Sequence, residues 1–250
     1  MTAKAKRALV TGGSAGLGAA AVRWLLAKGF DVVVLDRDQP RSDQAPVDFV
    51  QCDLANRTQL DSVIPGLIAA GPYDLVFLNA GINATGPFEG LDVQAHIDVV
   101  RVNTEAPMVI AARLFETNAF KPGAAMVFVS SLSHFTGYPG AASYAASKDA
   151  LAIYAKSMRK FAKSKGVSLT VAFPGPLRTA HAARHAPKGA DASKRMHTDQ
   201  AASLILADAF VGRKTAIPGA ANRTFAFIGK IAPKPVTALM RWVVYNKLSS

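Results

Sequence analysis

Residues 7–35 read RALVTGGSAGLGAAAVRWLLAKGFDVVVL and predict the first folding unit of the chain. A short apolar run at residues 7–11 leads into a glycine-rich loop and then into apolar residues at helical spacing. Residues 30–35 read FDVVVL, and this run, centred on three β-branched valines, is typical of a parallel strand buried on both faces. We therefore predict strand, loop, helix and strand within about thirty residues.

The loop at residues 11–18 predicts a pyrophosphate site. Its glycines permit a tight turn and a close backbone approach, and the N–H groups that open the next helix favour negative charge. The spacing Gly12, Gly16, Gly18 differs from G-x-G-x-x-G, and the lysine of a P-loop is missing, which counts against triphosphate hydrolysis. A purely structural glycine turn is the alternative.

Asp36 ends the second predicted strand, where its carboxylate can accept hydrogen bonds from the ribose hydroxyls of adenosine. Arg37 could instead pair with a 2′-phosphate. No basic residue occupies the loop at Ser14 or Ala15. We predict that NAD is preferred over NADP by roughly tenfold, or about 1.4 kcal/mol, although NADP stays open.

The remaining chain alternates apolar runs with helical patterns. Strands are expected at residues 47–52, 75–78, 124–130, 167–173 and 215–217, and helices at 56–67, 91–118 (bent near Pro107), from 141 onward, and 200–211. Residues 37–46 are expected to form a loop in place of a crossover helix. The alternation predicts a doubly wound, mostly parallel α/β sheet in one domain, with ligands at the carboxyl ends of its strands. We expect a substrate loop or lid at about 179–199 and a divergent tail at about 213–250.

Residues 131–148, SLSHFTGYPGAASYAASK, hold a tyrosine and a lysine four positions apart. On a helix, Tyr144 and Lys148 share one face. The lysine ammonium favours phenolate, so we expect it to lower the tyrosine pKa from roughly 10 and make Tyr144 a general acid and base. An ordinary solvated helix face produces the same spacing.

Composition narrows the function classes. Half of the 250 residues are hydrophobic, enough to bury a sizeable core. The only cysteine, Cys52, excludes an intrachain disulfide, and no zinc-type cluster of Cys and His is present, so no metal site is expected. No secretion signal and no run of eighteen apolar residues is found, which favours a cytoplasmic location. The net charge of +12 favours a basic surface that attracts an anionic cofactor, and no nucleic acid is expected.

These features together resemble the short-chain dehydrogenase/reductase family over the chain to about Thr179. The matching pieces are TGGSAGLG at 11–18, Asp53, NAG at 79–81, Asn103, Ser131, Tyr144, Lys148 and PGPLRT at 174–179. The resemblance implies a Rossmann-like seven-stranded sheet with helices on both faces, and a nicotinamide cofactor. One departure is Leu78-Asn79, where the family carries paired asparagines.

The resemblance also implies residue roles. Tyr144 would donate or accept the proton, Ser131 would orient the substrate carbonyl, and Lys148 would bind the nicotinamide ribose. Asn103 would hold a relay water, unless it is an ordinary polar helix residue. The implied cofactor-binding residues are Gly12, Ser14, Ala15, Gly16, Leu17, Gly18, Asp36, Arg37, Asp53 (near the adenine, or a simple helix cap), Leu54, Asn79, Ala80, Gly81, Tyr144, Lys148, Pro174, Gly175, Leu177 and Thr179 (near the carboxamide).

We predict reversible hydride transfer between a nicotinamide cofactor and a secondary alcohol or ketone. The expected substrate wall is formed by Leu132, Ser133, His134, Phe135, Tyr138 and the loop after Thr179. For His134, a position on a surface loop is favoured over a contact with substrate. The rival interpretations are a nucleotide-sensing module without turnover, and a basic protein associated with membrane or nucleic acid.

Residues 236–248 carry apolar side chains near helical spacing, with cations among them. Such a helix can dock on a partner subunit or make peripheral contact with an anionic membrane. Subunit packing is favoured here, because the resemblance implies a homodimer or homotetramer.

Overall fold

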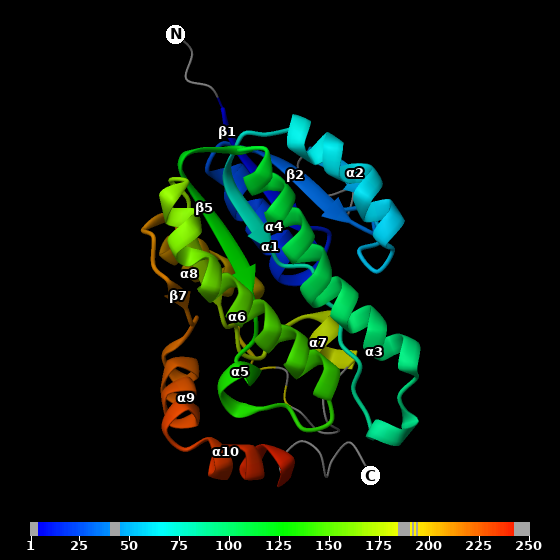
Figure 1. The fold of residues 1–250 in the computed structure, drawn as a ribbon. Helices are drawn as coiled ribbons and strands as arrows, with labels where there is room; N and C mark the ends of the chain where they lie inside the picture. Colours follow the sequence, from blue (N-terminus) through cyan, green and yellow to red (C-terminus); the bar gives the residue numbers. More distant parts are fainter. Residues whose placement is uncertain (1–4, 41–45, 185–190, 192, 194, 243–250) are drawn as a thin grey trace.

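A parallel sheet of seven strands in the order β3-β2-β1-β4-β5-β6-β7 forms the centre of the computed structural model (Figure 1). The structure describes residues 5–40, 46–184, 191, 193 and 195–242. The strands are β1 Lys6–Thr11, β2 Phe30–Asp36, β3 Asp48–Gln51, β4 Tyr73–Leu78, β5 Phe120–Val129, β6 Ser168–Ala172 and β7 Thr215–Ala216. The order reverses between β1 and β4, and a doubly wound sheet binds ligands at such a switch point. The predicted Rossmann-like fold is confirmed.

Helices cover both faces of the sheet, as predicted. The helices α2 (Arg57–Ala69), α4 (Ala106–Glu116) and α6 (Ala142–Ser164) pack on one face. On the other face lie α1 (Gly16–Ala27) and α8 (Thr198–Phe210), joined by stacking of Trp24 on Phe210 with ring centroids 5.9 Å apart. Because both faces are covered, the central strands β1, β2, β4, β5 and β6 are buried along most of their length rather than alternating, whereas the edge strand β3 has no fully buried residue.

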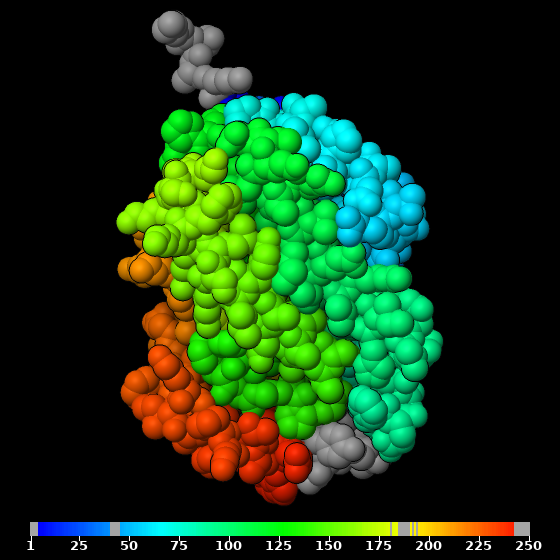
Figure 2. Space-filling model, in the orientation of Figure 1, coloured from blue at the N-terminus to red at the C-terminus, as the bar shows by residue number. Residues whose placement is uncertain are grey.

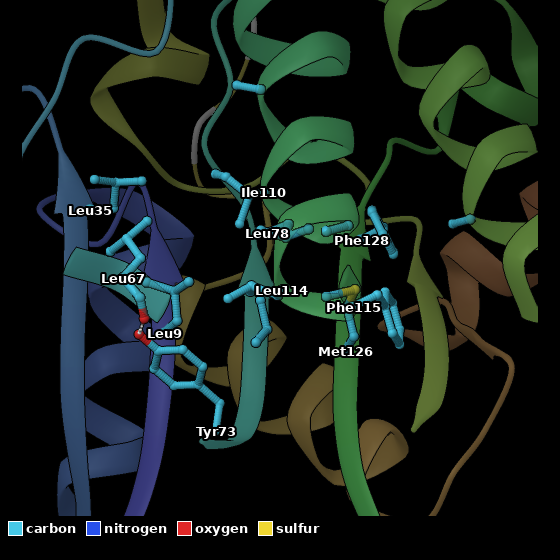
Figure 3. Packing of buried hydrophobic residues seen from close by; sticks show 14 of the residues in the cluster. Leu9, Leu35, Leu67, Tyr73, Leu78, Ile110, Leu114, Phe115, Met126 and Phe128 are labelled. Carbon is cyan, nitrogen blue, oxygen red and sulfur yellow. Dashed lines mark hydrogen bonds between the residues drawn. The ribbon is translucent and has the colours of Figure 1, made fainter. Parts of the chain in front are cut away.

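In the core under α2 and α4, apolar side chains of the strands pack against apolar side chains of these helices (Figure 3). Leu9, Leu78 and Phe128 project from neighbouring strands toward Ile110 and Leu114 of α4 (Figure 3). The single polar atom of fully buried Tyr73 is satisfied, since its hydroxyl donates to the Leu67 carbonyl at 2.6 Å. Burial raises the pKa of this phenol, so it stays protonated and is no rival for proton transfer.

Several elements differ from the expectation. The helical region expected at 91–118 consists of a 3₁₀ turn, Phe88–Gly90, then α3 (Val93–Val100), a π-helical turn, Arg101–Glu105, and α4. The expected bend is thus a π turn just before Pro107, which sits in the first turn of α4, where a missing N–H costs nothing. Pro65 lies inside α2 without ending it.

Two short helices were also not predicted. The helix α5 (Ser133–Thr136) follows β5, and α7 (Ala180–Arg184) occupies the start of the expected loop at 179–199. Of the loop expected at 37–46, residues 41–45 lie outside the described residues, as do 185–190, 192 and 194 of the lid.

The tail contains α9 (Ala220–Ile231), which was not predicted, and α10 (Pro233–Met240). Of the helix expected at 236–248, residues 236–240 belong to α10, which begins at Pro233, and residues 243–248 lie outside the described residues. None of the helices in the described ranges has the length and hydrophobicity needed to span a bilayer.

Candidate active site

The glycine loop between β1 and α1 packs so closely against its surroundings that a side chain at Gly12 or Gly18 would not fit. A Cβ on Gly18 would lie 1.9 Å from the Gly12 carbonyl oxygen, and one on Gly12 would lie 2.8 Å from Ala80 Cα. Gly12 and Gly16 also have φ values of +67° and +55°, a left-handed conformation that glycine adopts without strain. The spacing of these glycines therefore fits the loop to β4 and to the start of α1.

The start of α1 fits an anionic ligand. Ala15 stands at the N-cap and makes no side-chain hydrogen bond to the helix, and the first turn contains no acidic residue. The first N–H groups of α1 therefore have no side-chain partner, and the positive end of the helix dipole faces the loop. This arrangement suits a pyrophosphate.

Asp36 joins the second strand to the glycine loop. Its carboxylate accepts hydrogen bonds from the Ser14 N–H at 2.9 Å and the Asp38 N–H at 3.3 Å. The Ser14 hydroxyl donates to the Asp38 carbonyl at 2.5 Å, so Ser14 serves the loop itself. Arg37 is exposed, with its Nε 3.6 Å from Asp38 Oδ1. We call the edge of the site formed by Asp36, Arg37 and Asp38 the rim. It thus carries two carboxylates and one cation, and this cation, Arg37, is already paired with Asp38.

The floor of the site is held by Asn79 and Thr11. Asn79 Nδ2 donates to the carbonyls of Thr11 and Gly12 at 3.1 and 3.2 Å. The N–H groups of Asn79 and Ala80 both donate to Thr11 Oγ1. Asp53 accepts from the Ala55 N–H at 3.0 Å, while Asn56 rather than Asp53 caps α2. One asparagine at position 79 is therefore sufficient to join the ends of β1 and β4.

A cavity of about 1000 Å³ collects most of the predicted residues. Those that line it are Gly12, Ala15, Gly16, Leu17, Asp36, Arg37, Asp53, Leu54, Asn79, Ala80, Gly81, Ser131, Tyr144, Lys148, Pro174, Gly175, Leu177 and Thr179. The predicted residues Ser14, Gly18 and Asn103 do not line the cavity. The volume stands at the upper end of ordinary ligand sites, as expected for a dinucleotide together with a substrate.

Lys148 is almost fully buried, at 3% exposure, in the second turn of α6. Its Nζ donates to the Val129 carbonyl at 2.9 Å and lies 5.9 Å from the centre of the Tyr144 ring. Burial lowers the pKa of Lys148 to about 8, because an ammonium loses hydration in the interior. The charge beside the tyrosine is therefore costly to maintain.

Tyr144 differs from the expectation in its acidity. Burial raises the pKa of the phenol above its ordinary value, and Tyr138 adds to the rise, while a hydrogen bond with Ser131 opposes both. The expected lowering by Lys148 is not found. The physical reason is that the Lys148 ammonium is directed to Val129 O, and the surroundings penalise phenolate more than that ammonium favours it.

Asn103 lies in the π turn and is fully buried. Its Nδ2 donates to Ile82 O and Ser147 Oγ, and its Oδ1 accepts from the Ile82 N–H at 2.9 Å. Both amide hydrogens are used, and one lone pair of Oδ1 remains. A Cβ on Gly81 would lie 3.2 Å from that oxygen and 3.1 Å from Lys148 Nζ. Asn103 thus stands beside the lysine, and its role toward a relay water stays a prediction.

The substrate side is only partly as expected. Leu132, Ser133 and Tyr138 line the cavity, whereas His134 and Phe135 do not. His134 Nδ1 lies 2.8 Å from Asp149 Oδ1, and its Nε2 lies 3.0 Å from Lys156 Nζ. The inclusion of His134 and Phe135 in the substrate wall was wrong, because α5 turns these rings onto Phe173.

The tail lines the cavity, although its sequence indicated little chemistry. The contributing residues of α9 and α10 are Ala221, Asn222, Phe225 and Met240. A Cβ on Gly229 would lie 2.2 Å from Phe135 O, so α9 packs directly against α5. A glycine inside an apolar helical pattern indicates such a contact, but it does not identify the partner.

Comparisons with known proteins agree with this geometry. The sequence pattern of the short chain dehydrogenase family matches residues 6–189. An uncharacterized oxidoreductase of Myxococcus xanthus is 32% identical over 68% of this chain and 71% of its own. Acetoacetyl-CoA reductase of an Acinetobacter species is 27% identical over 68% of this chain and 73% of its own.

The fold is shared with solved structures. A short chain dehydrogenase from Burkholderia cenocepacia J2315 in complex with NADP has a TM-score of 0.78 at 23% identity, covering 96% of this chain and 99% of that one. This likeness extends through the tail helices, beyond the residues that the family pattern matches. With the pattern covering most of the chain and the sheet order as described, the protein belongs to the short-chain dehydrogenase/reductase family.

Proposed function

We propose that the protein is an oxidoreductase that uses NAD or NADP to interconvert a secondary alcohol and a ketone, with Tyr144 as general acid and base. One observation carries the proposal. One cavity is lined by the glycine loop and the start of α1 and also by Ser131, Tyr144 and Lys148. These residues are far apart in the sequence, since Gly12 and Lys148 are separated by 136 positions. A dinucleotide whose phosphates lie at α1 can thus extend toward the tyrosine.

The nicotinamide ring supplies the hydride chemistry when the cofactor is bound. The glycine loop, Asp36 and the floor around Asn79 would hold the cofactor, and Lys148 would contribute an ammonium near its ribose. Thr179 packs beside Gly16, with its Cγ2 3.3 Å from the position a Cβ would take there, so it lines the cavity at its phosphate end. These residues fit the group in charge and in space.

Proton transfer belongs to Tyr144. Its hydrogen bond with Ser131 places two hydroxyls together, which can both contact one substrate oxygen. In the direction of reduction, the protonated phenol can donate its proton, and the raised pKa makes it a weaker acid than an ordinary tyrosine. In the direction of oxidation it must become a base, and this requires added positive charge near the ring.

The rim favours NAD. A 2′-phosphate would meet the carboxylates of Asp36 and Asp38, and Arg37 is already within 3.6 Å of Asp38. Like charges at an exposed site repel by a few kcal/mol at most, so a preference of about tenfold remains our prediction. The residues Ala182, Arg184, Asp191 and Arg195 from the region after Thr179 also line the cavity, and we propose this region as a substrate loop of a single domain.

A purified-protein screen tests the proposal. Ketones and secondary alcohols are offered with NADH, NADPH, NAD and NADP, and the fluorescence of the reduced cofactor is followed. Turnover that Tyr144→Phe removes supports the proposal. Cofactor binding without turnover on a broad panel would instead support a nucleotide-sensing module. Homo-oligomers and a cytoplasmic location stay predictions.

A further inference from the structure

The basic charge of the protein is concentrated in its tail. The last acidic residue of the sequence is Asp208, whereas residues 213–250 contain seven cations. This segment therefore contributes +7 of the net +12. The cations are Arg213, Lys214, Arg223, Lys230, Lys234, Arg241 and Lys247. Arg213 is paired with Asp208, whereas Arg223, Lys230, Lys234 and Arg241 lie in or next to α9 and α10. This asymmetry indicates a polyanionic partner for that part of the tail.

Helix α9 presents an apolar stripe to solvent. Ala226 and Gly229 are buried against the body of the protein. On other sides of the helix, Phe227, Ile228 and Ile231 are 64, 45 and 67% exposed. Positions 227, 228 and 231 adjoin on a helix surface. The stripe is therefore not the face that joins α9 to α5, and it has no partner in the described chain.

Helix α10 and the residues after it extend this character. Leu239 is 49% and Trp242 is 69% exposed. Arg223, Lys230, Lys234 and Arg241 are exposed, and within the described residues they form no ion pair. We call α9, α10, Arg241 and Trp242 the tail surface. It lies at the end of the molecule to which β5 points, in orange and red (Figures 1 and 2).

We propose that the tail surface docks on an anionic lipid bilayer. Exposed aromatic and aliphatic side chains flanked by unpaired cations are the features of helices that lie in the membrane interface, where the apolar groups enter the acyl region and the cations meet lipid phosphates. None of the described helices is both long enough and apolar enough to cross the bilayer, so the proposed contact is peripheral. This proposal is independent of the proposed reaction.

Two other occupants are less well matched. In a twofold contact of the tail surface with a second copy, each set of cations would face the other, since the same patch is used twice. Nucleic acid would neutralise the cations but would leave Phe227, Ile231 and Trp242 against phosphates and sugars. A bilayer with anionic headgroups satisfies both the charge and the apolar stripe.

Docking would also place the cavity beside the membrane. The face of α9 and α10 that meets the protein contributes Phe225 and Met240 to the cavity wall. The same two helices therefore separate the candidate active site from the surface that docks.

Vesicle co-sedimentation of the full-length protein tests the proposal. Wild type is compared on phosphatidylcholine vesicles with and without phosphatidylglycerol. Two double variants probe the two components, F227S/I231S for the stripe and K230E/K234E for the charge. Matched controls at exposed positions elsewhere are V93S/V211S and K160E/K163E. Melting curves and solution mass are recorded for every variant.

We expect wild type to bind only the anionic vesicles. Reversal of two surface charges should weaken partitioning at least about 25-fold, at about fivefold for each cation lost, and the two added carboxylates should weaken it further. Loss of the two apolar side chains should weaken partitioning about tenfold or more, and the controls should bind like wild type.

The proposal is overturned if wild type does not bind anionic vesicles, or if vesicle binding by the controls falls as much as binding by the tail variants. Dissociation of an oligomer by F227S/I231S with unchanged vesicle binding would assign the surface to a second copy. Binding to DNA that only K230E/K234E weakens would assign it to nucleic acid.

Discussion

Replacing Lys148 by methionine should make the protein more stable at pH 7 while abolishing most of its activity. Burial lowers the pKa of Lys148 from 10.5 to about 8. At about 1.4 kcal/mol per pH unit, keeping this lysine charged costs the folded state roughly 3 kcal/mol. Methionine fills a similar volume without a charge, but it loses the hydrogen bond to Val129 O, which offsets about 1–2 kcal/mol.

The difference in stability between Lys148→Met and wild type depends on pH. Because the folded pKa lies below the unfolded one, the folded state binds fewer protons between pH 8 and 10.5, so the cost is complete below pH 8. At pH 9.5 it falls to roughly 1 kcal/mol, as the wild-type lysine in the folded protein is then mostly neutral. The variant should therefore be about 1–2 kcal/mol more stable at pH 7 and no more stable at pH 9.5.

Chemical and thermal unfolding at both pH values measure this effect. A gain of 1–2 kcal/mol corresponds to a rise in Tm of roughly 2–8 °C for a chain of this size. Lys160→Met, at an exposed position of the same helix, serves as the control and should show no gain. If Lys148→Met were less stable than wild type at pH 7, or if its difference from wild type were the same at both pH values, burial would not set the charge state of this lysine.

Three further substitutions test the site. Tyr144→Phe should lower turnover roughly 100-fold or more while cofactor binding, followed by fluorescence titration, stays intact, because the ring is kept and only the hydroxyl is lost. Ser131→Ala should lower kcat with little change in cofactor affinity, measured in the same titration, since Ser131 contacts the phenol. Asp36→Asn should raise the ratio of kcat/KM with NADP to that with NAD about tenfold, because it removes a rim charge; an unchanged ratio would exclude Asp36 as its origin.

Local patterns predicted the sheet and the phosphate end of the site. Strands β2 and β4 contain the apolar runs 32–35 and 75–78, and this pattern arises because both faces of each run are buried. Gly18 follows the same rule, since it is required by the Gly12 carbonyl six positions away, whereas Gly12 is required by Ala80, which follows the distant strand β4. Where the physical cause lies within one βαβ unit, the sequence pattern was sufficient.

Other features depend on contacts between distant segments and were not predictable in the same way. The π turn at Arg101–Glu105 brings Asn103 to Ile82 and Ser147, and no local propensity indicates it. The direction of His134 is set by Asp149 and Lys156 on the next helix. Helix α9 lines the cavity because Gly229 meets α5, a pairing that a single sequence does not reveal.

The acidity of Tyr144 shows most clearly how a correct motif can lead to an incorrect electrostatic expectation. The i, i+4 spacing correctly placed Lys148 one turn from the phenol. Spacing alone does not predict how strongly the fold removes the phenol and the ammonium from solvent. In the folded protein, burial raises the pKa of the phenol and lowers that of the ammonium, so the same desolvation opposes both charges. A base at Tyr144 therefore needs a further cation or hydrogen-bond donor to enter the cavity. A positively charged nicotinamide ring supplies such a charge, which would link the basic form of the tyrosine to the presence of the oxidised cofactor.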